Sequence, residues 1–154
     1  MAKLEEIISD ESQYSEKQRA VMAISIAAHL INENYEAVLA PFNLTVHQYQ
    51  VLRVLLKAYP DSLSVQQIRG NIHDHKSDVP RLIMRLQKLG FAKQQKPKGG
   101  VKAYRISLTE HGYDTLDRIA RQMDLKKPVS NITNEEAKQL NRLLLKIMKP
   151  FIEE

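Results

Sequence analysis

Basic side chains are concentrated in the middle of the chain. Between Gln66 and Arg105 there are ten lysines and arginines but only two acids, Asp74 and Asp78, so this stretch carries a net charge of +8. The rest of the chain holds 13 basic and 16 acidic residues, a net charge of −3. A basic segment on a slightly acidic frame is typical of a protein that binds a polyanion. A lysine-rich solvated surface gives the same count, so charge alone leaves both interpretations open.

The segment from Ser77 to Leu89 has the pattern of a helix that reads DNA bases. Its apolar residues recur at helical spacing and form one face: Val79, Leu82, Ile83 and Leu86. At about 100° per residue, the opposite face carries Ser77, Arg81, Met84, Arg85 and Lys88. A helix in the major groove needs an apolar back, forked cationic donors in front and a slim first turn. An ordinary amphipathic helix with a solvated basic face is the alternative.

The start of this helix depends on how Pro80 is accommodated. Proline is tolerated in the first helical turn, where its missing N–H has no partner to lose. If Ser77 is the N-cap, Pro80 is the third helical residue, and Lys76 belongs to the preceding turn. The helix is expected to stop at Gly90, the usual residue type just past a helix end.

A second basic feature follows this helix. Residues 91–95 and 104–108 have the length of strands, and turn-forming residues including Pro97, Gly99 and Gly100 separate them. This pattern predicts a β-hairpin with a cationic tip formed by Lys96, Lys98 and Lys102. Such a tip is suited to the DNA backbone or the minor groove, where lysines supply affinity and salt dependence but little sequence information.

Helical segments surround these two features. Helices are expected over residues 14–39, 45–58, 64–72, 109–125 and 133 to about 150, with residues 126–131 as a loop. Three of the starts have the capping-box pattern, Thr45 with Gln48, Ser64 with Gln67, and Thr133 with Glu136. Three helices followed by a hairpin predict a winged helix-turn-helix in a mainly α (α+β) fold. The outer helices carry apolar stripes that a chain this small buries most simply in a homodimer.

Other chemistries are poorly supported. His73, Asp74 and His75 offer metal-binding side chains, but three adjacent residues cannot all point at one ion, so a polar turn is the preferred interpretation. The chain has no cysteine and only five glycines. It lacks the phosphate-cradling and nucleophile motifs of common enzymes. We therefore expect no catalytic residues, no metal and no cofactor.

From its composition we expect a soluble protein of the cytoplasm. Its 43% hydrophobic and 27% charged residues are those of a globular protein rather than a disordered one. The longest apolar run, from Ala20 to Ile31, is shorter than the roughly 20 residues that a membrane span requires. Acidic residues near the start of the chain do not fit a secretory signal.

From about Leu44 to Leu125 the sequence resembles the MarR family of winged-helix transcriptional regulators. The resemblance rests on residues 44–52, 77–91 and 106–112. It implies one domain over residues 1–154, with the winged helix-turn-helix at about 44–108 and dimerisation helices at about 13–40 and 109–152. It also implies a homodimeric repressor that binds pseudo-palindromic double-stranded DNA and is often released by a small anionic or phenolic effector.

The family's DNA contacts carry over to Lys76, Ser77, Pro80 and Arg81, and to the tip around Lys98 to Lys102. With the outward face and the hairpin, the candidate DNA-binding residues are Lys76, Ser77, Pro80, Arg81, Arg85, Lys88, Lys96, Lys98 and Lys102. The family's ligand pocket lies between the reading unit and the dimerisation helices. Five side chains are placed near such a space but are expected in ordinary packing or surface roles: His29, Tyr35, His47, Tyr49 and Tyr113.

Two departures from the family pattern support an alternative. The hairpin tip has neither the aspartate nor the arginine of the family's Asp-x-Arg motif, and Pro80 replaces a small polar residue. A winged helix that binds a protein partner without specific DNA readout is therefore the second hypothesis. The charge of +8 argues against it, because a protein-binding module does not need that charge.

Overall fold

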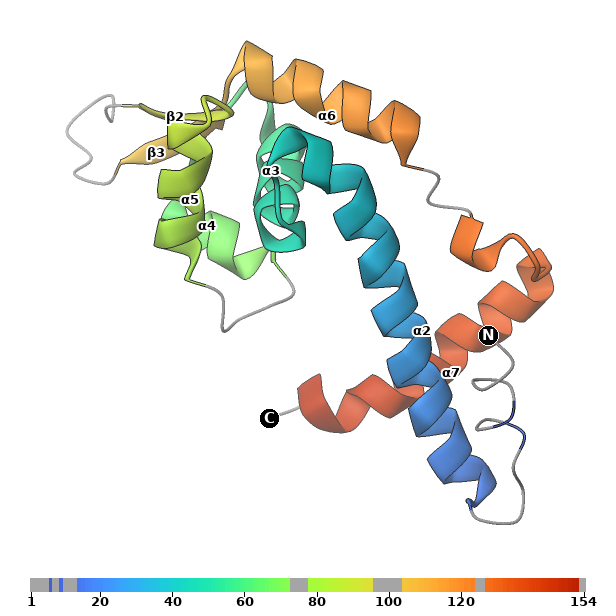
Figure 1. Cartoon of the computed structure of the whole chain (residues 1–154). Helices are drawn as coiled ribbons and strands as arrows, with labels where there is room; N and C mark the ends of the chain where they lie inside the picture. The colour runs from blue at the N-terminus through green and yellow to red at the C-terminus, as the bar shows by residue number, and fades with distance from the viewer. Residues whose placement is uncertain are drawn as a thin grey trace. The chain divides into compact units, whose positions relative to one another are not determined.

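The computed structural model describes residues 14–72, 78–95, 104–123 and 127–152, together with Glu6 and Ser9. The described chain is mainly helical and contains a three-stranded antiparallel sheet. It divides into two compact units, residues 1–123 and 124–154, which are described separately. Figure 1 labels most of their elements. The first unit contains α2 (Glu16–Leu39), η1 (Ala40–Phe42), α3 (Val46–Ala58), β1 (Leu63–Ser64), α4 (Val65–Gly70), α5 (Val79–Lys88), β2 (Ala92–Gln95), β3 (Arg105–Leu108) and α6 (Glu110–Gln122).

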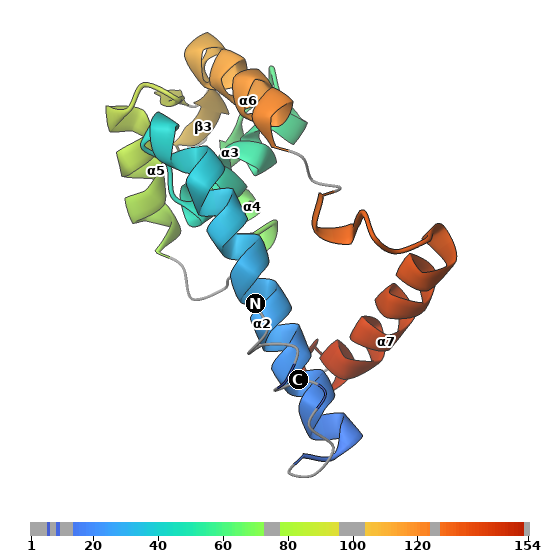
Figure 2. The ribbon, with the colours of Figure 1, turned by 45° about the vertical axis from the view of Figure 1, so that its right-hand side comes forward.

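The long helix α2 precedes the winged helix. Its N-cap is Ser15, whose side chain forms a capping box with Gln18. The C-terminal end of α2 contacts α3 and α6, while its N-terminal part extends away from them, as Figure 2 shows. Leu39 at this C-terminal end is fully buried in the core of the first unit. The predicted first helix over residues 14–39 is confirmed.

Helices α3, α4 and α5 form the three-helix core of the winged helix. The side chains of Thr45 and Ser64 accept hydrogen bonds from the backbone N–H groups of Gln48 and Gln67, as the capping-box pattern predicts. These caps satisfy N–H groups that have no partner inside the helix and so fix where α3 and α4 begin. Both helices contribute buried side chains, among them Val51, Leu55 and Ile68.

The N-cap of α5 lies one residue later in the chain than predicted. The N-cap is Asp78, whose Oδ1 accepts a hydrogen bond from the Arg81 N–H at 3.3 Å. The N-cap assignment to Ser77 was therefore wrong, and Pro80 is the second helical residue instead of the third. The reason for tolerance is unchanged, because no N–H in the first turn has a helical partner. The helix ends at Lys88, and Gly90 follows with a positive φ of 77°.

The three-stranded sheet has the order β1-β3-β2. Strands β2 and β3 pair antiparallel in the register Ala92 to Leu108, which confirms the predicted hairpin to within one residue at each strand. Strand β1 was not predicted. It pairs with β3 through Leu63 and Ser64, and the Arg105 side chain donates hydrogen bonds to the hydroxyl and carbonyl oxygens of Ser62 just before it.

Hydrogen bonds and close packing join the start of α6 to the residues that follow α5. The Thr109 hydroxyl donates to the Gly90 carbonyl oxygen at 2.7 Å, and the Thr109 N–H donates to the Phe91 carbonyl oxygen at 3.0 Å. Gly112 lies so close that a Cβ there would overlap the Phe91 carbonyl oxygen. The His111 ring stacks on Phe91 with centroids 5.0 Å apart. The end of α5 and the start of α6 therefore form one tightly packed junction.

The second unit consists of η2 (Lys127–Val129) and α7 (Asn134–Ile152). The predicted capping box is present, since Thr133 and Glu136 hydrogen-bond each other's backbone N–H groups. Residues 127–129 of the predicted loop form a 3-10 turn. Helix α7 ends at Ile152, within two residues of the predicted end. Several apolar side chains of α7 are exposed in the monomer, namely Leu140, Leu143, Leu145, Ile147, Met148 and Phe151. Within the part of the chain that the structure describes, no helix has the length and apolar character needed to cross a membrane.

Candidate nucleic-acid interface

The back of α5 is held in the core as its sequence pattern predicts. Val79, Ile83 and Leu86 are at most 4% exposed, and Leu82 is partly buried against them. This burial fixes the rotation of the helix and turns the opposite face to solvent. The helix contacts α3, α4 and β2, so three elements fix its position.

The front of α5 is exposed and cationic. Arg81, Arg85 and Lys88 are all exposed, as are Pro80 and Met84. None of the three cations forms an ion pair with another described residue. Their charge is therefore available to an external anion. The other predicted DNA-binding residues lie outside the described residues: Lys76, Ser77, Lys96, Lys98 and Lys102.

An open groove of about 420 Å³ separates the front of α5 from the first turn of α3. Four residues of α5 and its cap line one wall, namely Asp78, Arg81, Leu82 and Arg85. Gln48 of α3 lines the other wall. The local sequence pattern of Gln48 predicts only its role in the capping box of α3. Its place in the groove depends on how the two helices pack, which the local pattern does not reveal.

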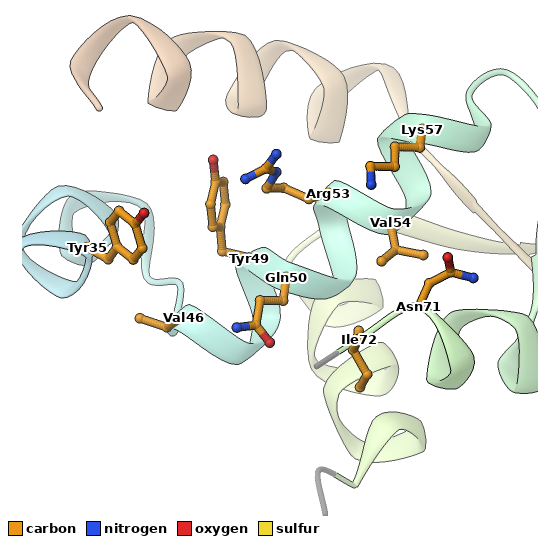
Figure 3. Close-up of a pocket in the computed structure, with 9 residues that line it drawn as sticks. All are labelled: Tyr35, Val46, Tyr49, Gln50, Arg53, Val54, Lys57, Asn71 and Ile72. Carbon is orange, nitrogen blue, oxygen red and sulfur yellow. The ribbon is translucent and has the colours of Figure 1, made fainter. Parts of the chain in front are cut away.

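A second concave site lies between the end of α2, one side of α3 and the chain after α4. This pocket has a volume of about 260 Å³, and Figure 3 shows its lining. Tyr49, Arg53 and Lys57 come from successive turns of α3, Tyr35 comes from α2, and Asn71 follows α4. The remaining lining residues are Val46, Gln50, Val54 and Ile72. None of the described residues that line it is acidic, so it is suited to an anion with an aromatic or apolar body.

The Tyr49 side chain is the most electrostatically perturbed group in this pocket. Burial raises the pKa of its hydroxyl above the ordinary tyrosine value, and the positive charge of Arg53 offsets part of this rise. The Arg53 guanidinium carbon lies 6.0 Å from the centre of the Tyr49 ring. The hydroxyl of Tyr49 is therefore protonated at neutral pH and available as a hydrogen-bond donor.

Only part of the predicted pocket set lines this site. Tyr35 and Tyr49 do, whereas His29, His47 and Tyr113 are not among its lining residues. The Nε2 atom of His29 lies 3.4 Å from Oε1 of Glu33 on the exposed side of α2. Tyr113 packs against Tyr59 with ring centroids 5.1 Å apart. Arg53 and Lys57 were not singled out from the sequence. They follow Tyr49 at successive intervals of four residues, which places all three on one helical face.

No metal-binding cluster is found among the residues that the structure describes. The one predicted candidate, His73-Asp74-His75, lies outside the described residues.

The chain is similar in sequence to a curated regulator, although no model of a protein family matches it. It is 24% identical over 142 residues to the HTH-type transcriptional regulator MgrA of Staphylococcus aureus, a match that covers 92% of this chain and 95% of MgrA.

Several solved structures share the fold. AbsC of Streptomyces coelicolor, a MarR family transcriptional regulator, has a TM-score of 0.80 and 19% identity, covering 92% of this chain and 98% of AbsC. MepR of S. aureus, solved as a DNA complex, has a TM-score of 0.76 and 19% identity, covering 89% and 99% of the two chains. The organohalide-sensing regulator RdhR-CbdbA1625, solved with 2,4-dichlorophenol, has a TM-score of 0.75 and 20% identity, covering 92% and 84%.

Proposed function

Because this chain has the winged-helix fold of the MarR family, we propose that it is a homodimeric transcriptional regulator that binds double-stranded DNA and responds to a small ligand. In this proposal its function is binding rather than catalysis, and it acts in the cytoplasm as a repressor. The observation that carries the proposal is the front of α5, where Arg81, Arg85 and Lys88 are exposed without ion-pair partners among the described residues.

In this proposal α5 enters the major groove and the hairpin supports it. Arg81 lies in the first turn of α5, the part of a recognition helix that approaches base edges, and its forked donors match guanine. The proposed contact set is the one that the sequence predicts, with Lys96, Lys98 and Lys102 on the backbone or minor groove. These lysines contribute mainly to affinity for DNA of any sequence.

The homodimer is supported by the apolar surface of α7. Leu140, Leu143, Ile147 and Phe151 are all exposed and recur at helical spacing on one face of α7, and an exposed apolar face of this kind marks an interaction site. Two copies of the chain present two α5 helices, so the operator is expected to be two-fold symmetric.

The pocket beside α3 is the proposed effector site. Tyr35 and Tyr49 provide aromatic surface, and Arg53 and Lys57 provide positive charge, which fits a small aromatic anion. Asn71 and Ile72 form part of the lining and directly precede the segment that leads to α5. A ligand that contacts them has a short path for changing the position of the reading helix.

Selection of binding sites from a pool of random duplexes tests this function. The enriched sites are then measured by fluorescence anisotropy over a series of salt concentrations. A two-fold symmetric site that is held more tightly than random DNA, with a steep salt dependence, is the expected result. Absence of enrichment, with weak binding lost at physiological salt, would instead favour a winged helix that binds a protein partner.

A further inference from the structure

Gln48 is a largely buried polar residue whose side-chain amide nitrogen has no hydrogen-bond partner among the described residues. It is 8% exposed. Its Oε1 accepts a hydrogen bond from the Thr45 N–H at 3.0 Å, and its own backbone N–H donates to Thr45 Oγ1 at 3.3 Å. The oxygen of the amide is therefore fixed by the cap, which leaves the amide nitrogen at the other end of the planar group. No described residue accepts a hydrogen bond from that nitrogen.

The groove between α3 and α5 is where an acceptor for this nitrogen would lie. Gln48 lines it together with Arg81 and Arg85. The only acid in the described lining is Asp78, whose Oδ1 already accepts a hydrogen bond from the Arg81 backbone N–H. Two arginines against one acid leave the groove positively charged. An amide donor whose orientation is fixed, beside two guanidinium groups, is suited to an oxyanion, because hydrogen bonds to a charged acceptor are the strong ones.

The direction of α3 adds to the same preference. Gln48 lies in the first turn of this 13-residue helix, so the groove borders the positive end of the helix dipole. This contribution alone would not define a site. It reinforces the donor of Gln48 and the charge of the two arginines.

We propose that the groove between α3 and α5 binds one phosphate of the DNA backbone, with Gln48 donating its amide N–H and the Arg85 guanidinium contacting the phosphate. Arg81 adds positive charge at the groove while its own donors face a base edge. This inference rests on the proposed function, because a recognition helix in the major groove is flanked by backbone phosphates. The phosphate contact gives α3 a positioning role: it holds the DNA at a set distance from α5. Gln48 thus serves as a helix cap and as a DNA contact.

The substitution Gln48→Glu tests the inference without removing the cap. A glutamate at this position is the other standard partner of a capping box, so α3 should still begin at Val46. The donor nitrogen becomes a charged oxygen that repels phosphate. We expect affinity to fall roughly tenfold or more, by a similar factor for the selected operator and for random duplexes. Thermal unfolding followed by circular dichroism should match the wild-type protein.

Gln18→Glu is the matched control. Gln18 has the same role in the capping box at the start of α2, is exposed, and does not line the groove. The control therefore makes the same change of charge at the same kind of helix position. We expect it to change affinity less than about twofold. An equal loss in both variants would overturn the proposal, since it would trace the effect to net charge.

Methylphosphonate substitution then identifies the phosphate. Each backbone linkage of the operator is made neutral in turn, and affinity is measured for wild-type protein and for Gln48→Glu. One linkage per half-site should weaken the wild-type complex but leave the variant complex unchanged or strengthen it, because the neutral linkage also removes the repulsion by the introduced carboxylate. Additive losses at every linkage would overturn the proposal. If wild-type protein binds no duplex at all, the proposed function fails with it.

Nuclear magnetic resonance of the Gln48 side-chain amide separates DNA from free phosphate. The expected result is a shift of its two amide protons on titration with the duplex, and no comparable shift with inorganic phosphate. A shift with inorganic phosphate and none with the duplex would show a site for the free anion, and would contradict the DNA assignment while leaving DNA binding by α5 intact.

Discussion

Two neighbouring residues of α3 lead into two different hollows. Gln48 lines the groove toward α5, while Tyr49 lines the pocket toward α2. Both sites are cationic, but their other components differ. The groove combines Arg81 and Arg85 with Asp78 and has no aromatic side chain in its described lining, whereas the pocket places its cations beside two tyrosine rings and contains no acid among its described lining.

This difference indicates two kinds of anion. A polymer phosphate needs access and charge but no enclosing apolar wall, since it remains attached to a larger solvated molecule. A small organic anion has to gain its affinity from contact with most of its surface, so it requires aromatic and apolar lining. Because consecutive residues of a helix point about 100° apart, Gln48 and Tyr49 direct their side chains into two different sites of α3. Substitutions that affect one site should therefore leave the other unchanged.

The largest effect is expected for Arg81→Ala. Loss of a bidentate base contact costs about 1–3 kcal/mol for the cognate site and relaxes the preference at that base pair. Sites are selected from random duplexes with the variant and compared with those selected by the wild-type protein. Fluorescence anisotropy then measures the affinity of the variant for the wild-type operator. Arg53→Ala, in the pocket, is the control and should retain operator affinity in the absence of ligand. An unchanged sequence preference in Arg81→Ala would remove this residue from base readout.

A smaller effect is expected for Arg53→Gln on ligand binding. The exposed guanidinium should contribute about 1 kcal/mol to the binding of an aromatic anion. Calorimetric titration with benzoate, and with benzyl alcohol as the neutral analogue, measures this. Benzoate should bind the wild-type protein more tightly than benzyl alcohol, and the variant should reduce that difference. Equal affinities of the two compounds for wild-type protein would show that the pocket does not select charge.

Asp78→Asn should strengthen DNA binding by a few tenths of a kcal/mol to about 1 kcal/mol. The change removes the only acid in the described lining of the groove, and asparagine is as good an N-cap as aspartate. Anisotropy at two salt concentrations should show a gain that shrinks at the higher one. Thermal unfolding is the control for the cap. Weaker binding together with an unchanged melting temperature would mean that Asp78 itself contacts the DNA.

The smallest effect concerns pH in the pocket. Because burial raises the pKa of Tyr49, the folded protein favours the neutral hydroxyl. Its contribution to stability is present below the ordinary tyrosine pKa and is lost as the pH rises through the raised value. Tyrosinate absorbance is followed during alkaline titration of wild-type protein and of Tyr49→Phe. The transition that is present only in the wild-type protein belongs to Tyr49, and we expect its midpoint at a higher pH than that of a free tyrosine. A transition at the ordinary pH would contradict the burial of this hydroxyl.

The sequence predicts those parts of the fold that depend on local chemistry. The caps at Thr45, Ser64 and Thr133 are formed by residues three positions apart, and the apolar face of α5 follows from its period. The N-cap of α5 was misassigned because serine and aspartate are adjacent here and both are strong caps. Only the hydrogen bond to the Arg81 N–H distinguishes them.

Features that depend on distant pairing were missed. Strand β1 has two residues and exists only because Leu63 and Ser64 pair with β3, more than 40 residues later. Similarly, the capping box predicts what Gln48 does for α3, but the packing of α5 against that helix determines what its amide nitrogen faces. The pocket cations Arg53 and Lys57 had a visible helical spacing, yet nothing in their own pattern distinguishes a lined pocket from an open surface.

The junction at Gly112 has a consequence for how much sequence change this protein tolerates. Any other residue would place a Cβ against the Phe91 carbonyl oxygen and the Leu108 side chain. In a library of all single variants selected for operator binding, we expect this position to accept no replacement. The adjacent Tyr113, which is 45% exposed, should accept many. Descendants of this chain can therefore diverge at most positions of the α6 surface while this one glycine stays constant.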